Sequence, residues 1–130
     1  KNLPNFAVAI CYEISDGLKI REAVKKGAEM ILVIANLDPY PKKIHDQFIS
    51  IASIRSLENN RETVIASNTG PSGLIRSDGR IDKFIEKDTS ENFTVYPNKI
   101  NQNTFYNKYG LQILTIIFIL LISVNFFISP

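Results

Sequence analysis

The sequence contains no tryptophan, one cysteine and one histidine in 130 residues. A single cysteine cannot form an internal disulfide, and one cysteine with one histidine argues against a structural zinc site, which needs four ligands. The formal net charge is only +2, and no basic run is interleaved with aromatic residues, so we expect no nucleic-acid partner. These absences leave no sign of a metal centre, and we expect no cofactor.

The residues that are present describe a folded chain. A content of 45% hydrophobic and 22% charged residues is typical of folded rather than disordered proteins, and 130 residues suffice for one domain of ordinary size. The chain begins at Lys1, with no initiating methionine and no signal-peptide pattern. We therefore expect it to be the later part of a longer protein.

A long apolar run near the end of the chain is the strongest single signal. Residues 111–129 contain no charge in 19 positions, and the apolar residues would lie all round a helix. Because about 20 such residues span a bilayer, we predict a transmembrane helix over 111–129; the alternative is a very hydrophobic core helix. Lys99 and Lys108 precede the run and no charge follows it, which by the positive-inside tendency places the upstream side in the cytoplasm.

Upstream of this run, the pattern alternates between strands and helices. Short apolar runs predict buried strands at 6–11, 30–35 and 63–66, in a sheet that helices cover on at least one face. Two helices are expected between them: one begins at Ser15 or Asp16 and ends at Gly27, and an amphipathic one covers 42 to about 59.

The remaining residues predict a hairpin and a connector. Asp78-Gly79 is a hairpin turn signal, and 93–96 reads as one more strand. We expect a mixed α/β body over residues 1–97, a polar connector over 98–110 and the membrane helix over 111–129.

Cys11 stands at the carboxyl end of the first expected strand, just before a turn into a helix. Open α/β sheets present reactive groups at this position, and the N-terminus of the following helix favours a thiolate and can bind an oxyanion. Glu13 acts in the opposite direction, because a carboxylate two residues away repels a thiolate. Position alone leaves two interpretations open: a buried space-filling residue or a nucleophile.

The residues around Cys11 and a series of later motifs resemble one enzyme family. Ile10-Cys11-Tyr12-Glu13-Ile14 is similar to the nucleophile motif of the nitrilase (carbon–nitrogen hydrolase) superfamily, and more narrowly of its membrane-bound branch, the apolipoprotein N-acyltransferases. Further similarities follow in the family's order: Gly27-Ala28-Glu29, Asn36, Gln47, Ala52, Arg55, Glu58, Asn59, Arg61, Asn68-Thr69-Gly70, Ser72-Gly73, Asp78-Gly79 and the segment from Thr104 to Gly110.

The resemblance implies a fold and a mechanism. The fold would be the C-terminal part of a nitrilase-like α-β-β-α sandwich followed by one transmembrane helix. The superfamily uses a Glu, a Lys and a Cys, and the Cys forms a thioester. In the N-acyltransferase branch the acyl donor is a phospholipid, and the acceptor is the N-terminal amine of a diacylglyceryl-cysteine lipoprotein.

The resemblance also assigns roles to residues. By position, Cys11 matches the nucleophile, Tyr12 offers a backbone N–H suited to an oxyanion, and Glu13 matches a carboxylate that supports the site. The Glu and Lys of the triad would precede Lys1, so the chain alone should be catalytically incomplete. The family's topology implies the bacterial inner (plasma) membrane with the catalytic domain on the periplasmic side, which opposes the lysine signal.

The chain departs from the family's pattern at two places. Ser15-Asp16-Gly17 stands where members continue with an aromatic residue and proline. Leu37-Asp38-Pro39-Tyr40 stands where they have an Asp followed by a small residue and Trp. Both segments line the substrate side in the family. Two alternatives stay open: a membrane-anchored carbon–nitrogen hydrolase of amidase type, and a non-catalytic membrane-tethered interaction domain.

Three other groups have structural interpretations. Arg55 and Glu58, three apart, either pair at the surface or brace the loops of the site, as the resemblance implies. His45 is expected on a solvated helix face, with no second metal ligand beside it. Asn68-Thr69-Gly70 is expected to be a turn shaped by glycine first and a wall of the site second.

Overall fold

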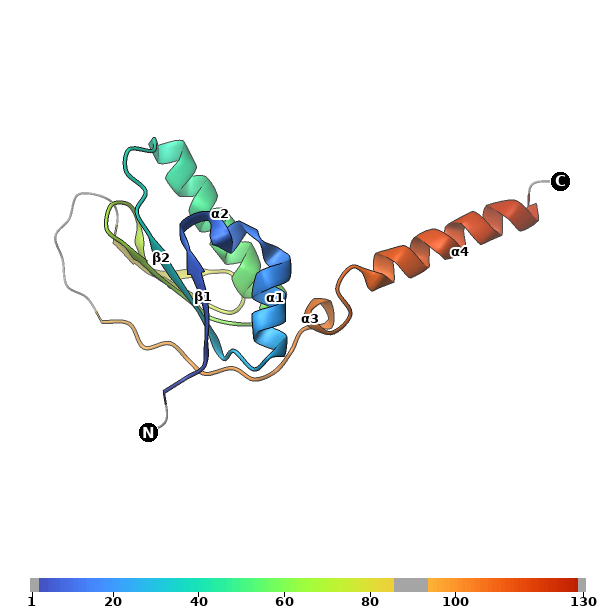
Figure 1. The fold of residues 1–130 in the computed structure, drawn as a ribbon, viewed down its shortest axis with the longest axis horizontal. Helices are drawn as coiled ribbons and strands as arrows, with labels where there is room; N and C mark the ends of the chain where they lie inside the picture. The colour runs from blue at the N-terminus through green and yellow to red at the C-terminus, as the bar shows by residue number, and fades with distance from the viewer. Residues whose placement is uncertain (1–2, 86–93, 129–130) are drawn as a thin grey trace.

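Five strands form one mixed sheet in the computed structural model, which describes residues 3–85 and 94–128. Strands β1 (Phe6–Ile10), β2 (Met30–Ala35) and β3 (Thr63–Ser67) are parallel neighbours. Strands β4 (Ser72–Ile75) and β5 (Ile81–Ile85) continue the sheet in antiparallel fashion, so the order is β1-β2-β3-β4-β5 (Figure 1).

Two helices connect the parallel strands and pack on the sheet. Helix α1 (Gly17–Lys25) begins at Asp16, whose carboxylate accepts the Lys19 N–H at 3.1 Å. Helix α2 (Lys42–Asn59) is followed by Asn60 as its cap, in the left-handed conformation with φ 51°, which asparagine tolerates better than most residues. The two helices and the sheet share one apolar core, to which α1 contributes Ile20 and Val24 and α2 contributes Phe48 and Ala52.

The opposite face of the sheet is uncovered among the described residues. Along β1, buried alanines alternate with exposed Phe6, Val8 and Ile10, and on β2 Ile34 is exposed as well. Val8 is 55% exposed and Ile10 62% exposed, although both are β-branched residues in the middle of an apolar run. The expectation of a fully buried first strand is therefore wrong for the residues described, because the helices cover only one face.

Most of the predicted elements are present close to the predicted positions. The strand at 30–35 and the helix at 42–59 are confirmed, and the third strand extends to Ser67. The hairpin turn around Asp78-Gly79 joins β4 to β5, with the Arg76 N–H donating to the Arg80 carbonyl at 2.8 Å. The prediction of a strand at 93–96 is wrong for residues 94–96, which form no strand, and residue 93 lies outside the described residues.

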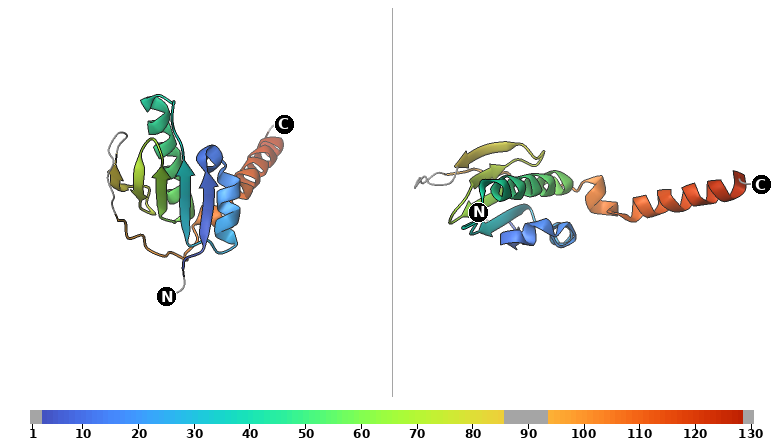
Figure 2. Two further views of the ribbon diagram at one scale, coloured as in Figure 1. Left: turned by 60° about the vertical axis from the view of Figure 1, so that its left-hand side comes forward. Right: turned by 90° about the horizontal axis from the view of Figure 1, so that it is seen from above.

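The end of the chain forms two helices that lie apart from the sheet. Helix α3 (Phe105–Tyr109) packs beside α1 and α2, and helix α4 (Gln112–Ile128) extends away from the body (Figures 1 and 2). The predicted transmembrane helix over 111–129 is not confirmed. With 17 residues, α4 is about 26 Å long at 1.5 Å per residue, against an apolar bilayer core of about 30 Å. Within 3–85 and 94–128, no helix combines the length and apolar character required to cross a membrane.

Candidate active site

The loops that follow the three parallel strands meet at one edge of the sheet. Two backbone hydrogen bonds join the loops after β2 and β3. The Leu37 N–H donates to the Thr69 carbonyl at 3.0 Å, and the Asn68 N–H donates to the Ala35 carbonyl at 2.9 Å. The Thr69 hydroxyl also donates to the side-chain oxygen of Asn36. Carboxyl ends of parallel strands are where open α/β sheets bind ligands.

The expected glycine turn in this loop is confirmed. Gly70 has a φ of 113°, and the side chain of Leu37 packs 3.0 Å from where a Cβ would stand. A residue larger than glycine would therefore be strained there and would also press on a buried leucine.

Cys11 begins the loop after β1. The strand ends at Ile10, and Cys11 is the first residue of a 3₁₀ turn, η1 (Cys11–Ser15). Its φ is 51°, in the left-handed region that residues with a Cβ seldom adopt, and its free thiol belongs to a half-buried residue. Such backbone strain, of order 1–3 kcal/mol, clusters at functional sites. This conformation is the unusual feature of Cys11 in the structure.

Tyr12 and Glu13 lie in the same turn. Glu13 Oε2 accepts the N–H of Ile10 at 2.9 Å, so the carboxylate closes the turn back onto the last residue of β1. The ring of Tyr12 contacts Phe48 of α2 edge to face, with centroids 5.9 Å apart. Tyr12 and Glu13 thus anchor the turn that begins with Cys11.

Arg55 both pairs with Glu58 and contacts the turn that follows β1. Its guanidinium pairs with Glu58 one turn further along α2. The same guanidinium donates to the carbonyls of Ile14 at 3.3 Å and Ser15 at 3.4 Å, which are the last two residues of η1. Arg55 therefore braces the turn that begins with Cys11.

The expectation for His45 is wrong. The residue is buried rather than solvated, and its Nε2 lies 3.1 Å from the Leu37 carbonyl oxygen. The loop that follows β2 returns onto His45 through Leu37, and this return leaves no periodic signal in the sequence.

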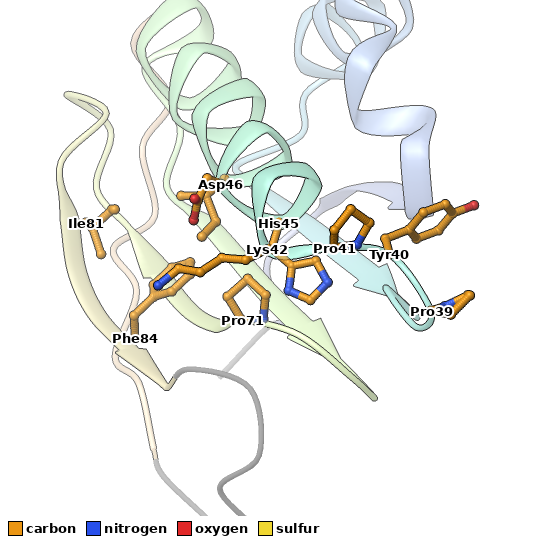
Figure 3. Close-up of a pocket in the computed structure, with 10 residues that line it drawn as sticks. Pro39, Tyr40, Pro41, Lys42, His45, Asp46, Pro71, Ile81 and Phe84 are labelled. Carbon is orange, nitrogen blue, oxygen red and sulfur yellow. The ribbon is translucent and has the colours of Figure 1, made fainter.

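A cavity of about 850 Å³ opens beside this edge, between the first turns of α2 and the hairpin (Figure 3). Lys42, His45 and Asp46 form its polar side, and Pro71, Ile81 and Phe84 stand across from them. Cys11 is not among its lining residues, so the cavity and the strained cysteine are separate features. Among the residues that the structure describes, no three His, Cys, Asp or Glu side chains gather in a way that could hold a metal ion.

The sheet and its helices match part of the fold found in the nitrilase superfamily. The chain resembles an amidase of that superfamily from Nesterenkonia sp. AN1, with a TM-score of 0.54 and 16% identity over 64% of this chain and 34% of that one. It also resembles a carbon–nitrogen hydrolase from Helicobacter pylori G27, with a TM-score of 0.58 and 12% identity over 65% of this chain and 37% of that one.

Sequence comparison narrows the relationship. The chain is 52% identical over 121 residues to the apolipoprotein N-acyltransferase of Prochlorococcus marinus subsp. pastoris, which covers 93% of this chain and 24% of that protein. It is 42% identical over 103 residues to the apolipoprotein N-acyltransferase of Parasynechococcus marenigrum, covering 79% and 22%. The chain is a homologue of these apolipoprotein N-acyltransferases and spans about a quarter of their length. No family model matches it.

Proposed function

We propose that the protein containing this chain is an apolipoprotein N-acyltransferase with Cys11 as its nucleophile. The observation that carries the proposal is the left-handed backbone of Cys11, φ 51°, at the carboxyl end of β1 in a chain with such relatives. A structural cysteine has no need of this strain, whereas a nucleophile presented beyond the end of its strand does. A Nesterenkonia amidase with the same fold is described with acrylamide added at its active-site cysteine.

The reaction runs in two half-reactions. A base in the longer protein takes the proton of the Cys11 thiol, and the thiolate attacks the ester carbonyl of a phospholipid. The carbon–oxygen bond breaks, and the lysophospholipid leaves with that proton. The amine of a diacylglyceryl-cysteine lipoprotein then attacks the thioester, so that an amide forms and the thiol is regenerated. The Tyr12 N–H stabilises the oxyanion, and Glu13 holds the turn through its bond to the Ile10 N–H.

The partners of Cys11 belong to the longer protein. The curated relatives are about four times as long as this chain, and we place the triad's Glu and Lys in segments before Lys1. Residues 1–97 would then form the later part of a nitrilase-like α-β-β-α sandwich. The exposed apolar face of β1 and β2 supports this, because it offers the surface on which a second sheet packs.

Helix α4 provides the contact with lipid. Its large apolar side chains are exposed from Leu114 to Val124, and such a surface on a folded protein marks an interaction with membrane or protein. We place the segment 111–129 in the apolar part of the bacterial inner membrane, the connector 98–110 at its surface, and the catalytic domain on the periplasmic side.

Acyl labelling of the full-length protein tests the proposal. The purified enzyme is incubated with vesicles of phospholipid that carries an alkyne-tagged acyl chain. We expect a hydroxylamine-sensitive label on the peptide that contains Cys11, and its loss in Cys11→Ala. The control is Ser50→Ala, which removes an exposed hydroxyl that donates to the Asp46 carbonyl of the same helix at 2.8 Å.

The fate of the label separates the functions. Discharge to the N-terminal amine of a diacylglyceryl-cysteine peptide supports the acyltransferase. Discharge to water alone would make the protein a membrane-anchored hydrolase, and absence of any label on Cys11 would leave a non-catalytic interaction domain.

A further inference from the structure

A set of polar contacts joins α3 to the last turn of α2. Asn59 and Asn107 are both fully buried, and Asn107 Nδ2 donates to Asn59 Oδ1 at 2.9 Å and to the Arg21 carbonyl at 3.4 Å. The Thr104 hydroxyl donates to the Glu58 carbonyl and accepts the Asn107 N–H at 2.9 Å. We call Arg21, Asn59, Thr104 and Asn107 the α3 junction.

Arg21 closes the other end of α3. Its Nε donates to the carbonyls of Tyr106 at 3.1 Å and Asn107 at 3.0 Å, and its Nη2 donates to the Lys108 carbonyl at 3.2 Å. The last carbonyls of a helix have no partner within the helix, so a guanidinium satisfies them well. A Cβ on Gly110 would lie 2.6 Å from the guanidinium carbon, and α4 begins two residues later at Gln112.

The last turn of α2, which contacts α3, also contacts η1, the turn that begins with Cys11. Arg55 donates to the carbonyls of Ile14 and Ser15, and Asn59 Nδ2 donates to the Arg55 carbonyl at 3.0 Å. Direct contacts therefore run from the end of η1, through one turn of α2, to α3, and Arg21 lies beside Gly110, two residues before α4. Segments almost a hundred positions apart in sequence are fixed to the same five residues of one helix.

The polar contacts of the α3 junction fix the position of α3 more than they stabilise it. An apolar contact would hold a five-residue helix with less desolvation, whereas Asn107 Oδ1 is buried with no hydrogen-bond partner among the described residues. Because Asn59 Nδ2 donates to the Arg55 carbonyl, Asn59 Oδ1 faces Asn107 as an acceptor, and Asn107 has to offer its Nδ2. What the pair adds is a single register of α3 on α2.

We propose that Asn59 and Asn107 are positioning residues that fix Cys11 relative to α4, and thereby relative to the donor lipid. This inference rests on the proposed function. The ester carbonyl of a phospholipid lies at a set depth in the interface, so the thiol must be held at a matching place. A soluble ester diffuses to the thiol and needs no such alignment.

Two acyl donors test the inference in the full-length enzyme. Single-turnover acylation of Cys11 is measured with phospholipid vesicles and with p-nitrophenyl butyrate, for wild type, Asn107→Ala, Asn59→Ala and the double variant. We expect the rate with vesicles to fall about tenfold, as misplacement of reacting groups does, and the rate with the soluble ester to stay unchanged. Because each variant is compared across two donors, a smaller folded fraction cancels from the ratio.

The loss in the double variant should be smaller than the two single losses combined, because both single variants remove the bond between Asn107 and Asn59. Each also removes one bond of its own, to the Arg21 or the Arg55 carbonyl. Asn101→Ala is the control, since it removes an exposed amide from the same connector. An equal loss with both donors, or no loss with vesicles, would overturn the inference while leaving the proposed function intact. A wild type that no donor acylates would reject the proposed function, and the inference with it.

Discussion

At the scale of the residue, the backbone of Cys11 limits what the position can carry. A residue with a Cβ in the left-handed region costs about 1–2 kcal/mol, which glycine avoids. Glycine in turn loses more chain entropy on folding, by about 0.4–1 kcal/mol. The balance favours glycine for stability, although only cysteine supplies the thiol.

We therefore predict that Cys11→Gly is more stable than Cys11→Ala by up to about 1 kcal/mol, with both variants inactive. The measurement is denaturant unfolding of the full-length protein. Ser50, an exposed residue inside α2, gives the matched comparison, because there glycine should be less stable than alanine by about 1 kcal/mol. The same sign at both positions would show that the left-handed conformation imposes no strain on Cys11.

At the scale of the element, the parts that sequence predicts best are those with a local cause. The apolar spacing predicts the bounds of α2, Lys42 to Asn59, but not its whole buried face, because Ile54 and Leu57 are exposed. An aspartate before an amphipathic stretch predicts the start of α1. The α3 junction has no such signal, since buried amides and main-chain carbonyls from distant segments leave no periodicity. For the same reason the contacts of Arg55 stayed open and the burial of His45 was missed.

The start of α1 makes a prediction about pH. The bond from the Lys19 N–H holds the pKa of Asp16 below its ordinary value, and the nearby Lys19 ammonium acts in the same direction. A carboxyl group with a lowered folded-state pKa stabilises the protein above its unfolded-state pKa, and this stabilisation is lost as the pH falls through the folded-state pKa. The contribution of Asp16 is thus complete near neutral pH and disappears in acid.

Asp16→Asn keeps a side-chain oxygen for the cap but cannot titrate. We expect its thermal midpoint to lie below that of wild type at pH 6, with the difference shrinking towards pH 3. The full-length protein is melted at both pH values, with Asp46→Asn, an exposed carboxylate inside α2, as the control. A difference that grows as the pH falls would contradict the assignment of Asp16 as the charged cap.

At the scale of the whole molecule, the described residues form one layer of helices on one sheet, with the second face of the sheet bare. Composition could not reveal this, because β1 and β2 read as apolar throughout whichever face is covered. The chain matches about a third of each of the nitrilase-superfamily structures that it resembles. The missing cover belongs to residues outside the chain if the proposed sandwich is right.

Val8 tests that arrangement, because it stands 55% exposed on the bare face. If a second sheet covers it in the full-length protein, Val8→Asn loses apolar burial and buries an amide without partners, at a cost of about 2–4 kcal/mol. Leu18, 57% exposed on α1, gives the matched control, and Leu18→Asn should change the free energy of unfolding by no more than about 0.5 kcal/mol. The measurement is denaturant unfolding of both full-length variants. Equal small losses of stability would mean that the face of β1 stays in solvent. An asparagine on an uncovered strand is less stable than valine only through its weaker strand propensity.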